Sequence, residues 1–93
     1  MIRIRVKFFG PFRDLFGGRE REIDLPADAR IKGLLQRLSD TAERDKQLFG
    51  VSGDLHPHVV VMKNGRPVLG QDGLESLLQD GDTVALFPFL GGG

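Results

Sequence analysis

The sequence predicts a single α+β domain, with a mixed sheet of four to five strands packed on one main helix. Residues 2–9 alternate apolar side chains with mostly basic ones, which is the period of a half-buried strand. Residues 31–38 repeat leucine and isoleucine at helical spacing, which is typical of a helix that packs one face on a sheet. Residues 58–63 hold three consecutive valines, and the hairpin signal Asn64-Gly65 follows them. A chain of 93 residues is too short for a second core.

The chain up to residue 25 predicts two strands joined by a short helical turn. In strand 2–9 the even-numbered residues are apolar and form the buried side. Phe9 falls on the side that carries the basic residues, where it is either a cover for the edge of the core or an exposed contact residue. A helical turn is expected between Pro11 and Gly17, and 19–25 reads as a second strand whose alternating charges suit an edge.

The middle of the chain predicts the main helix and a smaller companion. Asp28 is the natural N-cap for the helix over 31–38. Ser39-Asp40 breaks its pattern, a second short helix over 41–49 follows, and 50–57 reads as a loop.

The C-terminal third predicts short elements in quick succession. We expect a buried central strand at 58–63, a return strand at 66–69 with Pro67 at an edge, a helical turn at 74–78, a tight turn at 80–82 and a last strand at 83–87. Pro88 is expected to stop the ladder, because it has no N–H to donate. With the last strand beside the first, this order of elements is the ubiquitin-like β-grasp arrangement.

Composition excludes several classes of function. The 13 basic and 13 acidic residues cancel, so nothing indicates binding to nucleic acid or to an anionic membrane surface. No signal peptide or membrane-spanning stretch is recognisable, which favours the cytoplasm. The absence of cysteine removes disulfides, thiolate nucleophiles and sulfur-ligated metal sites.

No catalytic constellation stands out. His56-Pro57-His58 is the one histidine cluster, and no nearby acidic or cysteine pattern completes a metal site, so no metal is expected. Asp80-Gly81-Asp82 fits a turn better than catalysis or calcium binding. No serine triad and no phosphate-binding loop are recognisable. A carrier, a modifier or a binding module is therefore favoured over an enzyme that acts alone.

The last three residues, Gly91-Gly92-Gly93, are the most unusual stretch. Read alone, they are either a frayed end or an expression scar, or a tail without Cβ atoms that threads a narrow channel of another protein. We expect residues 1–90 to form the domain and 91–93 a flexible tail.

The chain resembles the ubiquitin-like sulfur carriers of the MoaD/ThiS family, and most closely the small subunits of molybdopterin synthase. The residues that carry the resemblance are Val6-Lys7-Phe8-Phe9, Phe12-Arg13-Asp14, Leu25-Pro26, the apolar stripe of 31–38, Asn64-Gly65, Leu77, Asp80-Gly81-Asp82-Thr83-Val84, Phe87-Pro88 and Gly92-Gly93. The chain departs from the family pattern at Phe89, where a second proline is usual, at Gly91, and in a longer 40–57 region.

The resemblance implies a mechanism and a set of partners. A ubiquitin-activating-type adenylyltransferase would use ATP and Mg²⁺ to adenylate the carboxylate of Gly93, and a sulfur donor would convert it to a thiocarboxylate. The carrier itself would bind no cofactor. The tail, with Gly91 and Gly92, would then enter the large subunit of molybdopterin synthase and deliver sulfur to the pterin precursor.

The same resemblance implies a contact surface and leaves the pathway open. Phe9 and Phe87 match positions that contact partner enzymes, and Pro88 and Phe89 are expected to join them. Alternatives are a carrier for thiazole or cysteine synthesis, a modifier that forms isopeptides through Gly93, or a plain binding module with an inert tail.

Overall fold

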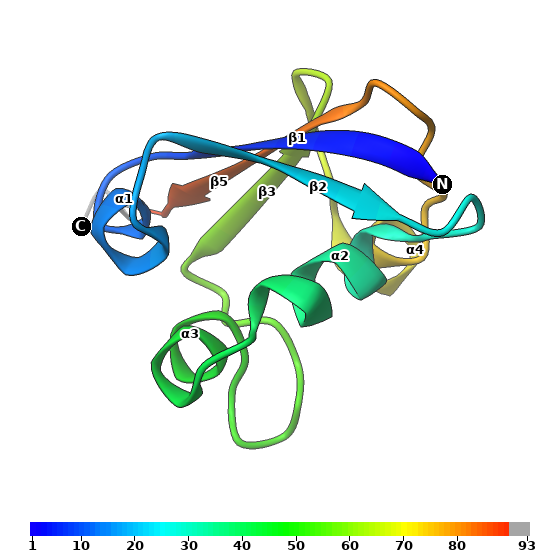
Figure 1. The fold of residues 1–93 in the computed structure, drawn as a ribbon. Helices are drawn as coiled ribbons and strands as arrows, with labels where there is room; N and C mark the ends of the chain where they lie inside the picture. The colour runs from blue at the N-terminus through cyan, green and yellow to red at the C-terminus, as the bar shows by residue number, and fades with distance from the viewer. Residues whose placement is uncertain (90–93) are drawn as a thin grey trace.

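The computed structural model describes residues 1–89 and shows one mixed, five-stranded sheet with its helices gathered mainly on one side (Figure 1). The strands are β1 Ile2–Phe8, β2 Glu20–Leu25, β3 Val59–Lys63, β4 Arg66–Pro67 and β5 Thr83–Pro88. The helices are α1 Phe12–Phe16, α2 Ile31–Leu38, α3 Ala42–Leu48 and α4 Gly70–Leu74. The predicted α+β class is confirmed.

The strand order β2-β1-β5-β3-β4 places the last strand at the centre of the sheet. β1 pairs antiparallel with β2 and parallel with β5, with Val6 opposite Val84. On its other side β5 pairs antiparallel with β3, with Val61 opposite Leu86. The final strand thus returns beside the first, as the β-grasp arrangement requires. β3 is an interior strand rather than the central one, and β2 and β4 form the two edges as expected.

A single apolar core lies between the sheet and the helices. The four stripe residues of α2 are all fully buried: Ile31, Leu34, Leu35 and Leu38. From the sheet, Ile4, Val6 and Phe8 of β1 and Val84 and Leu86 of β5 face them, again with almost no exposed surface. Burial of these side chains stabilises the fold by about 25 cal/mol per Å² of apolar surface removed from water.

The start of α2 differs from the expected one. The helix begins at Ile31 with Arg30 at the N-cap position and no side-chain cap, so the prediction that Asp28 caps it is wrong. Residues 26–29 form a turn instead, closed by a bond from the Ala29 N–H to the Pro26 carbonyl at 3.0 Å. The Ile31 N–H donates to the Ser76 carbonyl, so a distant segment satisfies the donor that a cap would have served.

The segment after the Asn64-Gly65 turn also departs from the prediction. The return strand ends at Pro67, and the helical turn lies at Gly70–Leu74 and not at 74–78. Leu77 instead forms an isolated antiparallel bridge with Arg30, and the Leu78 N–H donates to the Ala29 carbonyl. These backbone bonds to the segment before α2 hold residues 77 and 78 extended, which a helical turn would not allow.

The remaining elements agree with the sequence to within a residue or two. α1 lies in the 10–18 connection and ends at Gly17 in the left-handed region (φ 76°). α3 has Thr41 as its N-cap, whose hydroxyl accepts from the Arg44 N–H at 3.1 Å. Asn64 and Gly65 both have positive φ, as the predicted hairpin turn demands.

Candidate functional site at the end of β5

β5 is the central strand of the sheet, and its C-terminal end lies beside α1 (Figure 1). The prediction that Pro88 stops the ladder is wrong: Pro88 is paired with Val59, and the Phe89 N–H still donates to the His58 carbonyl at 2.6 Å. Successive residues of a strand point their backbone groups to alternate sides. The missing N–H of Pro88 therefore faces the β1 side, where β1 has already ended at Phe8.

Two phenylalanines meet on the sheet face opposite the core. The rings of Phe9 and Phe87 stack with centroids 4.2 Å apart and planes 9° from parallel, and both side chains are half-buried. The Arg13 guanidinium lies 5.6 Å from the Phe9 ring, within range of a cation–π contact. The parallel register brings the rings together, because the Phe9 N–H donates to the Leu86 carbonyl at 3.1 Å.

Gly10 fixes the path of the chain beside this stack. It has φ 60°, and a Cβ placed on it would lie 2.9 Å from Cγ of Pro88. The absence of a side chain at Gly10 thus lets the α1 connection pack directly against the last residue of β5. Phe89, one residue on, is 61% exposed.

The four predicted contact residues, Phe9, Phe87, Pro88 and Phe89, are therefore grouped at one end of β5. Whether they bind a partner stays a prediction. Gly91, Gly92 and Gly93 lie outside the described residues, as does the predicted domain boundary at residue 90.

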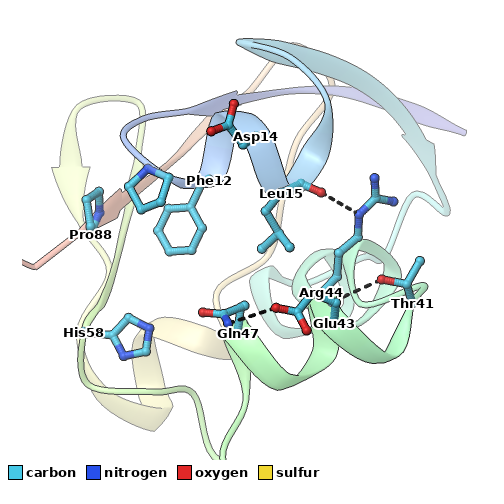
Figure 2. A pocket seen from close by; sticks show the side chains of 10 residues that line it. Phe12, Asp14, Leu15, Thr41, Glu43, Arg44, Gln47, His58 and Pro88 are labelled. Carbon is cyan, nitrogen blue, oxygen red and sulfur yellow. Dashed lines mark hydrogen bonds between the residues drawn. The ribbon is translucent and has the colours of Figure 1, made fainter.

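A groove on the helix side of the same end escaped the sequence analysis. It has a volume of about 630 Å³ and lies between α1 and α3, with Pro88 and His58 at one end. Figure 2 shows Phe12 and Leu15 pointing from α1 toward α3. The structure leaves Leu15, an apolar residue of α1, half-buried beside the groove, and nothing in the sequence marks it as different from the core residues Phe12 and Phe16.

Arg44 ties the two walls of this groove together. Its Nε donates to the Leu15 carbonyl at 3.0 Å, and its Nη1 lies 2.7 Å from the carboxylate of Asp40 (Figure 2 draws the first of these bonds). The hydrogen bond from Arg44 holds the pKa of the Asp40 carboxyl below its usual value. The guanidinium also lies 5.2 Å from the Phe16 ring. The longer 40–57 region thus supplies one wall of the groove and its link to α1.

The histidines do not form a metal centre with any described neighbour. His56 and His58 stack at 4.9 Å, and Nε2 of His56 lies 3.1 Å from the Lys46 carbonyl. Within residues 1–89, no group of three or more histidine, aspartate or glutamate side chains is arranged to hold a metal ion. No helix in that range is both long and apolar enough to cross a membrane.

Comparison with known proteins agrees with the fold. A model of the ThiS family matches residues 6–93. The chain belongs to the ThiS family of ubiquitin-like sulfur carriers. Its resemblance to the MoaD/ThiS carriers and its β-grasp fold are thereby confirmed.

Relatives of this ThiS-family chain include both modifiers and carriers. It is 33% identical to small archaeal modifier protein 3 of Haloferax volcanii, over 99% of the chain and all of that protein. It is 32% identical to a putative sulfur carrier protein of Archaeoglobus fulgidus, over 75% of the chain and 84% of that protein. Among solved structures, the putative molybdopterin converting factor subunit 1 of Pyrococcus furiosus superposes with a TM-score of 0.76 at 36% identity, over 95% of the chain and 98% of that structure.

Proposed function

We propose that this chain is a sulfur carrier that is loaded at the carboxylate of Gly93. One observation carries the proposal. Backbone bonds to β1 and β3 hold β5 through Phe89, so residues 90–93 start from a fixed point beside the Phe9–Phe87 stack. The family match extends through these last residues. Partner enzymes would bind the folded domain, and the reaction would take place at the C-terminal carboxylate.

The chemistry follows from the weakness of a carboxylate as an electrophile. The Gly93 carboxylate would attack the α-phosphorus of ATP on a ubiquitin-activating-type adenylyltransferase that holds Mg²⁺, and pyrophosphate would leave. A sulfide equivalent from a sulfur donor would then add to the acyl carbon, and AMP would leave. The product is a thiocarboxylate on Gly93. Gly91 and Gly92 would let this end pass through a channel too narrow for side chains. Because loading consumes ATP, we propose the cytoplasm as its site.

For the recipient of the sulfur we propose the large subunit of molybdopterin synthase. This chain would then be the small subunit, which performs no catalysis alone. The 36% identity to the putative molybdopterin converting factor subunit 1 of Pyrococcus furiosus supports this choice. Thiazole or cysteine synthesis would use the same loaded end and differ only in the recipient.

A second candidate function is protein modification. The 33% identity to small archaeal modifier protein 3 spans nearly the whole chain, which favours it specifically. In that function a lysine amine of a target protein would attack the activated Gly93, and an isopeptide bond would form. The two functions share the adenylation step and differ in the nucleophile that follows.

Intact-mass measurement tests the proposal directly. The purified chain is incubated with the adenylyltransferase of the same organism, ATP, Mg²⁺ and a sulfur donor, with a reaction lacking ATP as control. Exchange of one oxygen for one sulfur is the expected result. Adducts on lysines of other proteins would favour the modifier. An unchanged mass, under conditions that load an established carrier, would refute activation at Gly93.

A further inference from the structure

The groove between α1 and α3 has the composition of a binding site for one apolar side chain. Phe12 and Leu15 line it from α1, and Pro88 closes it at one end (Figure 2). Leu15 is only half-buried although it packs against the core, so part of its surface faces the groove. An apolar side chain that enters here would remove this surface from water.

The charges at the rim indicate what should accompany that side chain. Asp14 on α1 and Glu43 on α3 both line the groove. Neither carboxylate takes part in any ion pair among residues 1–89, and the one bond to the Glu43 side chain comes from the neutral amide of Gln47 at 3.2 Å. The guanidinium of Arg44 is already matched by Asp40. Two acidic groups around an apolar floor are complementary to a cation.

We propose that the groove binds a segment of the activating adenylyltransferase that presents an apolar side chain next to a lysine or arginine. This inference rests on the proposed function, because the adenylyltransferase must approach the end of β5 to reach Gly93. Pro88 forms the end wall of the groove, and Phe87 beside it lies on the opposite face of the sheet. A partner that contacts both the aromatic stack and the groove would bind the end of β5 on both faces of the sheet.

Charge reversal at one position of α3 tests this proposal, with its near neighbour as control. Glu43 and Asp45 are both exposed and both in the first turn of α3, so Glu43→Lys and Asp45→Lys each remove a favourable interaction with the helix dipole. Only Glu43 lines the groove. We expect Glu43→Lys to raise KM for the carrier about fivefold in ATP-dependent AMP release, with kcat unchanged, and Asp45→Lys to change neither.

A second measurement does not depend on any variant. In the wild-type chain, the methyl NMR signals of Leu15 and Thr41 should shift when the adenylyltransferase is added. Those of Leu69, which is 76% exposed but does not line the groove, should not. The shifts report contact at the groove even if Glu43→Lys proves unstable, in which case Glu43→Gln replaces it.

The outcomes separate this inference from the proposed function. If the wild-type chain is never adenylated, the proposed function fails and the inference falls with it. If it is adenylated, but both lysine variants have the same KM and the Leu15 methyls do not move, the groove is not the docking site and only the inference is overturned. Shifts of the Leu15 methyls that appear without the enzyme as carrier concentration rises would assign the groove to a second copy of this chain and also overturn it.

Discussion

The two ends of β5 are held in different ways. At its start, polar side chains fix the strand: the Asp82 carboxylate accepts from the Gln79 N–H at 2.8 Å and from Nδ2 of Asn64 at 2.9 Å. Oδ1 of Asn64 in turn accepts from the Thr83 N–H at 2.9 Å. At its end, the contacts are the stacked rings of Phe9 and Phe87 and backbone bonds to the neighbouring strands.

The two ends therefore have different roles: one stabilises the fold, and the other keeps apolar surface exposed for a partner. Asp82 is 9% exposed, and its carboxylate accepts hydrogen bonds from two part-buried donors, the Gln79 N–H and Nδ2 of Asn64. Phe87 and Phe89 keep apolar surface exposed, which contributes little to folding but is available to a partner. We infer that the start of β5 anchors the strand and that its end presents the apolar surface of Phe87 and Phe89 to a partner. The predictions below run from the largest expected effect to the smallest.

Deletion of Gly93 should have the largest effect on loading and should separate loading from thermal stability most clearly. We expect no detectable loading by intact mass, because Gly92 would place the carboxylate one residue short of the chemistry. The midpoint of thermal unfolding should not change, since a terminal glycine has no side chain to pack. Circular dichroism of both proteins at equal concentration measures this. A large fall in the midpoint would mean that the end of the chain packs on the domain. Continued loading would mean that Gly93 is not the residue that is activated.

Asp82→Ala should weaken the anchored end. It removes the acceptor of two part-buried hydrogen bonds, those from the Gln79 N–H and from Nδ2 of Asn64, at a cost of about 2 kcal/mol in the free energy of unfolding. For a domain of this size each kcal/mol lowers the unfolding midpoint by roughly 4–8 °C. Urea unfolding measures the loss. KM for loading, measured well below the midpoint, should stay at the wild-type value.

Asp72→Ala is the matched control, because Asp72 is exposed on α4 and its side chain forms no hydrogen bond or ion pair among residues 1–89. It should unfold like the wild-type chain. If Asp82→Ala lowered the free energy of unfolding no more than this control, the hydrogen bonds of Asp82 would not stabilise the start of β5.

Phe87→Ala should show the opposite pattern at the presenting end. Removal of the half-buried ring abolishes the stack with Phe9, and we expect the affinity for the adenylyltransferase to fall about tenfold, or roughly 1.4 kcal/mol. The unfolding midpoint should fall by only a few degrees. Isothermal titration calorimetry and thermal unfolding measure the two quantities.

Phe49→Ala serves as the control for aromatic loss. Phe49 is also half-buried, but it packs against the core at the end of α3, away from the stack. This variant should lose stability and keep its affinity. If both variants lost the same affinity for the adenylyltransferase, Phe87 would have only a structural role and would not be a contact residue.

Much of the fold could be predicted because its signals are local. The alternation in 2–9 and the stripe in 31–38 each depend on one face being buried, and both elements appear where the pattern puts them. The errors arose where a distant segment replaced a local interaction. Asp28 looks like an N-cap, but the helix begins only at Ile31, whose N–H donates to the Ser76 carbonyl. Leu77 was assigned to a helical turn although it pairs with Arg30.

That Phe9 and Phe87 lie on the same side of the sheet could be predicted, but the contact between them could not. Phe9 and Phe87 each fall on the polar side of a strand, and that signal is visible in the sequence. Their stacking depends on the parallel register of β1 and β5, which no single stretch encodes. The groove is harder still, because Arg44 reaches Leu15 across two separate helices. Its walls meet only after the core has folded.

Acid titration should give the smallest effect, confined to the anchored end. Nε of Arg3 donates to the Asp24 carboxylate at 3.0 Å, and this bond holds the pKa of Asp24 below its usual value. A carboxyl whose pKa is lowered by folding contributes stability that is complete above its unfolded value, about pH 4, and is lost as the pH falls through its folded value. Because both side chains are exposed, the loss should be slight and should shrink further in high salt. Asp24→Asn should remove this part of the pH dependence.

Amide protection factors, which correct for the pH dependence of intrinsic exchange, should therefore fall first near Arg3 in acid and stay unchanged at Phe87, where the described contacts include no carboxylate. Faster exchange at Phe87 first would mean that the presenting end, and not the anchor, responds to charge.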